Sequence, residues 1–146
     1  MKRINIPLEL IDIENGGYHC FLKVNLHGME RHMLLDTGAS RTIFDLSLLR
    51  SLLAHESFQA NEVKATGLGS AEIENFVVNI EHIKLGRLDL YDLEVGALDL
   101  EMVNKSYKAL GMQPVSGVIG SDLLMRYRAV IDFGKNKLML RISNSE

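Results

Sequence analysis

The sequence predicts a mainly β protein with a few short helices. Apolar and polar side chains alternate through most of the chain, which is typical of strands with one buried face. Glycines stand between many of the alternating runs, where hairpins turn. Helical spacing is confined to three short stretches, 46–54, 99–110 and a segment from Ser121 to about Tyr127.

Length and composition indicate one globular domain spanning residues 1–146. The 146 residues are 47% hydrophobic and 24% charged, enough for one core. A formal net charge of −3 gives no electrostatic reason to expect nucleic acid or an anionic membrane as partner. The single cysteine, Cys20, excludes a disulfide framework within the chain and a Cys-rich metal site. Without a signal peptide or a long apolar run, we expect a cytoplasmic protein.

The N-terminal third reads as strands. Residues 4–12 alternate, and Pro7 favours an edge position because proline cannot donate to a sheet ladder. Two further alternating runs, 19–27 and 30–36, are joined at Gly28 and predict a hairpin.

The middle of the chain predicts one helix and four strands. Asp45 precedes the apolar 3.6-residue spacing of 46–54 and is the expected N-cap of that helix. Two strand pairs follow, at 62–79 around the tip Gly67-Leu68-Gly69-Ser70 and at 80–85 and 88–95 around Gly86.

The last third predicts a helix, a strand, a second helix and a hairpin. The helix at 99–110 is stopped by Gly111 and Pro114, and the apolar strand 115–119 follows. The next helix starts at Ser121 or Asp122, and the chain closes with a hairpin whose strands are AVIDF and KLMLRI.

The segment with the strongest chemical character is Leu34-Leu35-Asp36-Thr37-Gly38-Ala39-Ser40. An apolar strand delivers an aspartate, followed at once by a hydroxyl and three small residues. The strand would hold Asp36 in a protected position, and the small residues would let the backbone turn and approach a ligand closely. Taken alone, Asp-Thr-Gly is also an ordinary turn sequence.

A second motif favours a functional loop at Asp36 over an ordinary turn. Val118-Ile119-Gly120 follows about 80 residues later, directly before the Ser121 helix, and a glycine-tipped hairpin lies between the two motifs. This order of an Asp-Thr-Gly-Ala loop, a glycine-rich flap and a hydrophobic-hydrophobic-Gly segment resembles the retropepsin-like aspartic peptidases. The resemblance covers roughly residues 19–142 and implies a closed, barrel-like β fold.

The resemblance also implies roles for individual residues. Asp36 would be the catalytic residue, in a loop supported by Thr37, Gly38, Ala39 and Ser40. Substrate, a peptide or protein, would lie as an added strand between this loop and a mobile flap. The implied flap and substrate-binding residues are Gly67, Leu68, Gly69, Val118, Ile119 and Gly120. No cofactor and no metal are implied, and no pair of histidines has metal-ligand spacing.

The chain departs from the viral members of that family at two places. Viral members carry an ion pair between the residues that correspond to Ser40 and Ser121. Hydroxyl hydrogen bonds or an Arg41–Asp122 contact would have to replace it. The C-terminal hairpin also stands where viral members have a short strand used for dimerisation, and it resembles cellular and bacterial members more.

One aspartate per chain leaves the expected chemistry incomplete. Peptide hydrolysis by carboxyl groups needs one to activate water and one to protonate the leaving group. A two-fold homodimer would bring two copies of Asp36 together. Asp132, in VIDFG, is a weaker candidate partner because Phe133 lacks the hydroxyl of Thr37. The alternatives are a catalytically weak or dormant peptide-binding or dimerisation module, and a half-enzyme that pairs with a different chain.

Overall fold

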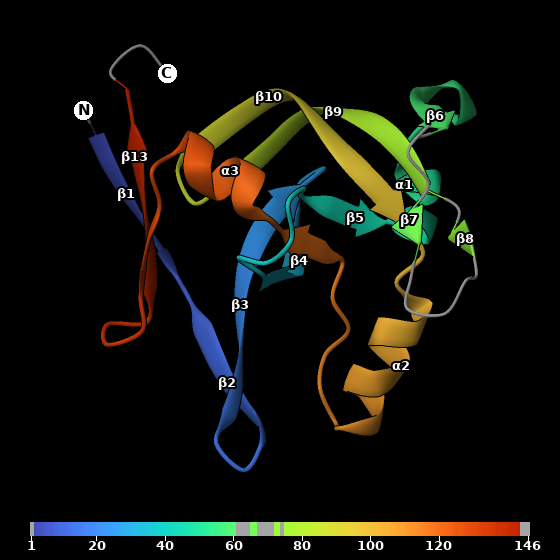
Figure 1. The fold of residues 1–146 in the computed structure, drawn as a ribbon. Coiled ribbons are helices and arrows are strands. Elements are labelled where there is room, and N and C mark those ends of the chain that lie inside the picture. The colour runs from blue at the N-terminus through green and yellow to red at the C-terminus, as the bar shows by residue number, and fades with distance from the viewer. Residues whose placement is uncertain (1, 61–64, 67–71, 74, 144–146) are drawn as a thin grey trace.

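The computed structural model describes residues 2–60, 65–66, 72–73 and 75–143. The fold is mainly β, as the sequence predicts, and the strands form three sheets (Figure 1). The eight-stranded sheet has the order β2 (Glu9–Glu14), β3 (Gly17–Leu26), β4 (Met29–Leu35), β11 (Gly117–Ile119), β5 (Ile43–Asp45), β10 (Leu88–Leu98), β9 (Asn75–Leu85) and β6 (Phe58–Ala60).

This sheet closes on itself. Asn25 and Leu26 of β3 pair with Lys84 and Ile83 of β9, in addition to the pairings in the strand order above. The ring β3-β4-β11-β5-β10-β9 is therefore continuous, in agreement with the barrel-like fold that the sequence predicts.

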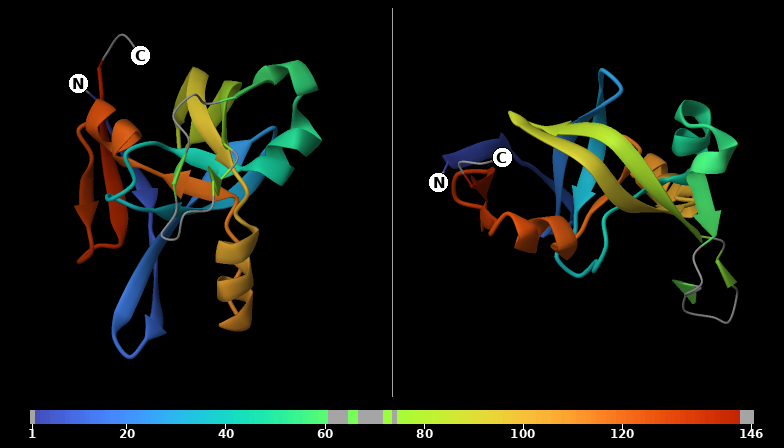
Figure 2. Two further views of the ribbon diagram at one scale, coloured as in Figure 1. Left: turned by 45° about the vertical axis from the view of Figure 1, so that its right-hand side comes forward. Right: turned by 90° about the horizontal axis from the view of Figure 1, so that it is seen from above.

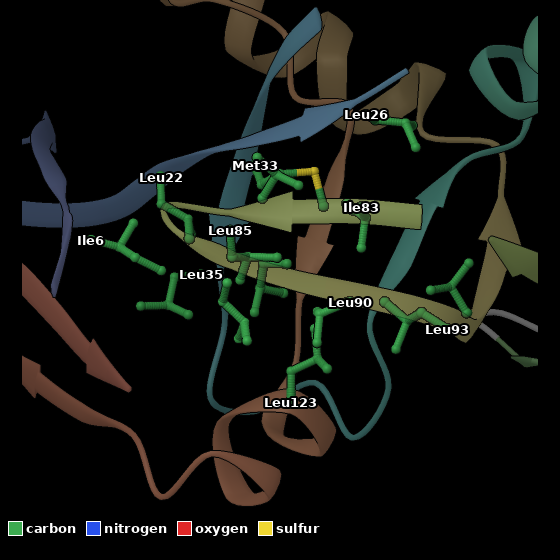
Figure 3. Packing of buried hydrophobic residues seen from close by; sticks show 14 of the residues in the cluster. Ile6, Leu22, Leu26, Met33, Leu35, Ile83, Leu85, Leu90, Leu93 and Leu123 are labelled. Carbon is green, nitrogen blue, oxygen red and sulfur yellow. The ribbon is translucent and has the colours of Figure 1, made fainter. Parts of the chain in front are cut away.

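The main core fills the inside of this ring. On β3, Leu22, Val24 and Leu26 are at most 2% exposed, whereas Lys23 between them is exposed, as period-two alternation requires. Figure 3 shows side chains from β3, β4, β9 and β10 converging there, with Leu123 from the neighbouring helix. A second, smaller cluster lies on the opposite face of β3 and contains Phe21, Leu100, Tyr107 and Val115.

The two ends of the chain meet in a separate three-stranded sheet of order β1 (Lys2–Pro7), β13 (Lys137–Ile142) and β12 (Val130–Asp132). Figure 2 shows β1 and β13 side by side at one end of the molecule, away from α1. Pro7 closes β1, an edge strand, as predicted. The single strand predicted at 4–12 is instead divided at Leu8, because β1 pairs with β13 and β2 pairs with β3.

The helices lie where the sequence predicts them: α1 (Leu46–Leu52), α2 (Glu101–Ala109) and α3 (Ser121–Arg126), with a short 3-10 helix at His55–Ser57. Asp45 is the N-cap of α1 and accepts from the Leu48 N–H at 3.2 Å. Its other oxygen accepts from the Leu100 N–H at 3.0 Å, which ties the start of α1 to the start of α2. Among the described residues, none of the helices has the length and apolar content needed to cross a bilayer.

The hairpins follow the prediction with one correction. His27 and Gly28 both have positive φ (52° and 78°) and turn β3 into β4. The break predicted between 79 and 80 is wrong, because β9 runs as one strand from Asn75 to Leu85 and keeps a single register against β10. The ribbon of β7 (Ala65–Thr66) and β8 (Glu72–Ile73) flanks the predicted flap tip, and Gly67, Leu68 and Gly69 lie outside the described residues.

His32 is a buried titratable group in the wall of this fold. Its ring is 7% exposed and stacks on Phe21 at a centroid distance of 4.5 Å. Its Nε2 has no hydrogen-bond partner among the described residues. Burial lowers the pKa of His32; the negative charge of Glu9 raises it to a smaller extent, and the positive charge of Lys23 lowers it further.

We expect this histidine to make the folded protein sensitive to acid. The folded state favours the neutral ring, while the unfolded chain takes up a proton near pH 6.5, so its contribution to stability falls as the pH drops below that value. His32→Phe keeps the stack and removes an unpaired buried nitrogen. Its free energy of unfolding at pH 7.5 should equal or exceed the wild-type value by up to about 1 kcal/mol.

The check is urea denaturation at pH 7.5 and pH 5.0. The loss of stability on acidification should be smaller in His32→Phe than in wild type, whereas the exposed-site control His55→Gln should behave like wild type. An identical loss in His32→Phe and wild type would contradict the assignment.

Candidate active site

The Asp36 loop is the turn between β4 and β5, next to the start of α3 in Figure 1. β11 lies between these two strands, parallel to β4 and antiparallel to β5. Residues on both sides of the loop are therefore hydrogen-bonded to one central strand. This arrangement fixes where the loop begins and ends.

Backbone hydrogen bonds hold the loop itself. The Asp36 N–H donates to the Ile119 carbonyl at 3.0 Å, and the Ser121 N–H donates to the Ala39 carbonyl at 2.7 Å. Within the loop, the Gly38 N–H donates to Asp36 Oδ1 at 2.9 Å. The carboxyl group is thus oriented by a main-chain donor two residues away, while Asp36 remains exposed.

Gly120 allows the closest approach between the two motifs. A Cβ at this position would lie 2.8 Å from the Ala39 carbonyl oxygen and 2.9 Å from that of Arg41, too close for any side chain. Both neighbours are backbone atoms, so no rotamer change could relieve the clash. This contact explains the glycine of the Val118-Ile119-Gly120 motif.

Thr42 bridges the same two segments. Its hydroxyl donates to Asp122 Oδ1 at 2.8 Å and accepts from the Gly120 N–H at 3.0 Å. The Thr42 N–H donates to Asp122 Oδ2 at 2.9 Å. Thr42 is fully buried, so these bonds act away from water, where a charged acceptor makes them strong. We call Thr42, Gly120 and Asp122 the loop bracket.

The loop bracket differs from both replacements considered for the viral ion pair. Asp122 is held by the hydroxyl and the backbone N–H of Thr42, a residue that the sequence analysis did not single out. The Arg41–Asp122 contact is wrong: Arg41 Nη1 lies 3.0 Å from Glu94 Oε1, on the exposed surface of β10. Ser40 is exposed, and the Ser121 N–H is bonded to the Ala39 carbonyl.

A cavity of about 330 Å³ lies beside the Asp36 carboxyl group. One wall comes from the end of β4 and the loop, and another from the outer half of β3. Its lining residues are Tyr18, His19, Cys20, Leu34, Leu35, Asp36, Thr37, Ile131 and Phe133.

A Tyr107–His19 pair adjoins this cavity and was not singled out from the sequence. Tyr107 on α2 is buried, and its hydroxyl lies 2.9 Å from Nδ1 of His19, which lines the cavity. Burial raises the pKa of Tyr107, and the negative charge of Asp36 raises it further. The phenol therefore stays protonated as a hydrogen-bonding group near the aspartate.

A second hollow of about 510 Å³ lies on the other side of Thr37. Its apolar part comes from α3 and β12, where Met125 and Val130 are 63% and 42% exposed, and Phe133 nearby is 58% exposed. Leu124, Ala129 and Ile131 also line it, with Ser121, Arg128 and Arg141.

Val118, Ile119 and Asp132 are the remaining candidate site residues in the described part of the chain. The side chains of Val118 and Ile119 are 9% and 1% exposed, so they support the loop from within, and their part in substrate binding stays a prediction. Asp132 accepts from the Lys135 N–H at 2.9 Å, which stabilises the β12–β13 turn. Among the described residues, no group of three or more His, Cys, Asp or Glu side chains could hold a metal ion.

Comparison with known sequences matches most of this chain to one protein family. A family model described as aspartyl protease matches residues 22–123. The DNA damage-inducible protein 1 of Chaetomium globosum is 27% identical over 125 residues, which cover 83% of this chain and 24% of that protein. Its counterpart in Neurospora crassa is 27% identical over 123 residues, covering 83% and 25%. The chain thus spans about a quarter of the length of these relatives.

Solved structures share the fold at low identity. A retropepsin-like aspartic protease from Rickettsia conorii aligns with a TM-score of 0.57 at 16% identity, over 95% of this chain and 89% of that one. The retroviral protease-like domain of Ddi1 from Leishmania major gives 0.55 at 14% identity, over 82% and 86%. The EIAV protease gives 0.54 at 18% identity, over 77% and 91%. The fold is therefore retropepsin-like, and the chain belongs to the aspartyl protease family.

Proposed function

We propose that this chain is an aspartic endopeptidase that works as a homodimer, with Asp36 of each copy forming the catalytic pair. The proposal rests on the position, orientation and solvent exposure of Asp36. It stands at the end of a buried strand, is oriented by the Gly38 N–H, and is nevertheless exposed. Membership of the aspartyl protease family supports the same assignment.

The chemistry follows from two carboxyl groups held close together. Like charges at short range cannot both ionise easily, so the pair shares one proton. The ionised carboxylate takes a proton from water, which attacks the peptide carbonyl carbon while the protonated carboxyl group gives its proton to the carbonyl oxygen. As the tetrahedral intermediate collapses, the first group passes the proton from water to the leaving nitrogen, and the second regains a proton from a hydroxyl of the intermediate. The pair titrates as a unit.

The second carboxyl group would come from another copy of the chain. Thr37 borders the 510 Å³ hollow, and the apolar side chains of Met125 and Val130 stand on the same side, with Phe133 close by. We call these three residues the apolar rim. A two-fold axis beside Thr37 would cover the rim of each copy with that of the other and bring the two Asp36 loops together.

The Tyr107–His19 pair would border the substrate channel. Both residues lie next to the cavity that the Asp36 carboxyl group lines. A protonated phenol and an imidazole would offer hydrogen bonds to a substrate side chain at a position flanked by Leu34 and Phe133.

Asp36→Asn should abolish cleavage. The amide keeps the size of the side chain but supplies neither the base nor the acid, so the rate should fall by roughly 10³-fold or more. The measurement is digestion of a broad peptide library, read by mass spectrometry. The variant should keep the wild-type circular dichroism spectrum and oligomeric state.

The same digest separates the proposal from the alternative of a dormant module. Cleavage by wild type that an aspartic-protease inhibitor blocks supports the peptidase. A folded wild-type dimer that cleaves nothing in the library would favour a peptide-binding or dimerisation module, and retained cleavage by Asp36→Asn would remove this aspartate from the mechanism.

Charge on the apolar rim should break the dimer. Val130→Glu combined with Phe133→Glu would bury carboxylates in the proposed interface, so we expect a monomer that lacks activity. The matched control is Met102→Glu, because Met102 is 75% exposed on α2 and lines neither cavity of the site. Sedimentation velocity measures the masses. A dimeric double variant, or a monomeric wild type at high concentration, would overturn the proposed interface.

Loss of the Thr42 hydroxyl should loosen the loop. Thr42→Val leaves the buried Gly120 N–H unpaired and takes one donor from Asp122. We expect a cost of about 2–4 kcal/mol in the free energy of unfolding, measured by urea denaturation, with a larger fall in kcat than change in KM. Thr42→Ser keeps the hydroxyl and should retain most stability and activity. Equal stability of the valine and serine variants would show that the bracket does not hold the loop.

A further inference from the structure

A further cavity lies away from Asp36. It is a groove of about 840 Å³ between the inner face of the β1–β13 sheet, the start of β10 and the end of α3. It shares no lining residue with the two cavities beside the Asp36 loop. Its lining residues are Lys2, Arg3, Ile4, Arg87, Leu88, Asp89, Leu90, Tyr91, Arg126, Tyr127 and Ile142.

The groove concentrates positive charge. Four basic side chains and one acidic side chain line it, although the whole chain carries a net charge of −3. Among the described residues, no ion pair joins any of the four cations to a carboxylate. The one carboxylate, Asp89, is already engaged by His82 Nε2 at 2.7 Å. The groove is therefore a site of uncompensated positive charge.

Lys2 occupies a position that the strand pattern would give to an apolar residue. Ile4 and Ile6 point inward from β1 and are 7% and 2% exposed, and Lys2 shares their parity. Its partner across the ladder is Ile142 of β13, at the mouth of the groove. Lys2 therefore lies where the buried face of the β1–β13 sheet ends at the groove.

The floor and walls are apolar and aromatic. Ile4, Leu88 and Leu90 line the groove and are buried. Tyr91 is 66% exposed and stacks on His82 at a centroid distance of 4.8 Å. A ligand that fits here therefore carries several negative charges next to apolar groups, as an acidic polypeptide segment does and a bare phosphate does not.

Helix α3 links the groove to the proposed catalytic loop. The helix starts at Ser121, bonded to Ala39 in the Asp36 loop, and ends at Arg126, in the groove wall. Six helical residues span roughly 9 Å, a distance that three or four residues of extended polypeptide cover. One polypeptide chain could occupy both places.

We propose that this groove binds an acidic segment of a polypeptide, held by Lys2, Arg3, Arg87 and Arg126. The choice of a polypeptide over another polyanion rests on the proposed peptidase function and on the apolar floor. The groove acts outside the catalytic loop, as a docking site that recruits chains with clustered Asp and Glu residues. Binding weakens as salt rises, because its attraction comes from exposed charges.

The test uses the full chain with Asp36→Asn, so that binding is read without cleavage. Fluorescence anisotropy measures binding of fluorescein-labelled deca-glutamate at low and high salt, with deca-glutamine as the uncharged probe. We expect deca-glutamate to bind and deca-glutamine not to bind. Adding Arg87→Glu and Arg126→Glu should weaken binding by about tenfold or more.

The matched control reverses two lysines elsewhere, Lys108→Glu and Lys135→Glu, which changes the net charge equally and should leave binding unchanged. Arg87→Gln with Arg126→Gln gives a milder groove variant, and circular dichroism verifies that each variant is folded. Equal weakening in the groove and control variants, or no binding of deca-glutamate at millimolar concentration, would overturn the proposal.

A third probe, a labelled ten-nucleotide single-stranded DNA, tests the partner class. Tighter binding of this DNA through Arg87 and Arg126 would replace the polypeptide with nucleic acid. If the wild-type chain cleaves nothing in the peptide library while deca-glutamate still binds, the peptidase function is refuted and the binding groove is retained.

Discussion

The structure around Asp36 depends on one close contact between two backbone segments. Residues 39–42 and 119–122 lie so near each other that Gly120 has no room for a Cβ. The Thr42 hydroxyl accepts a hydrogen bond from the Gly120 N–H and donates one to Asp122, so it links the two segments. Because these groups are buried, leaving any one unpaired would cost the full desolvation penalty of that group. These contacts therefore fix the position of the loop relative to β11.

The position of α3 follows from the same contact. Ser121 is bonded to the Ala39 carbonyl, and Asp122 belongs to the loop bracket, so the first turn of α3 is fixed to the loop. Leu123 then enters the main core (Figure 3), and Arg126 lines the groove. One helix of six residues thus connects the proposed catalytic loop, the barrel interior and the groove. Solved structures that are only 14–18% identical to this chain share its retropepsin-like fold. This is expected if such backbone contacts require few specific side chains.

Local features were predictable because their causes lie within a few residues. Asp45 caps α1 through a bond to Leu48, three residues away. His27 and Gly28 turn a hairpin in which neighbouring strands pair directly. The Asp36 loop was recognisable only together with Val118-Ile119-Gly120, because Asp-Thr-Gly alone is also an ordinary turn sequence.

Long-range choices were not predictable in the same way. The sequence offered Asp122 as a partner for Arg41, but Arg41 reaches Glu94 because β10 passes beside β5 in the closed ring. The division of 4–12 into β1 and β2 depends on β13 pairing with the first part and β3 with the second. Tyr107 meets His19 across 88 residues of sequence, and no local pattern joins them.

The sequence by itself determined the strand and helix types, the two motifs and the aspartate that belongs to them. The spacing of hydrophobic residues, the helix caps and the turn residues each involve residues that are close together in the sequence. They can therefore be identified without the tertiary structure. Only the tertiary structure decided the loop bracket, the pairing of Tyr107 with His19 and the gathering of four cations in one groove. These depend on how the ring closes and where the two ends of the chain meet, and that is set by the packing of all the strands together.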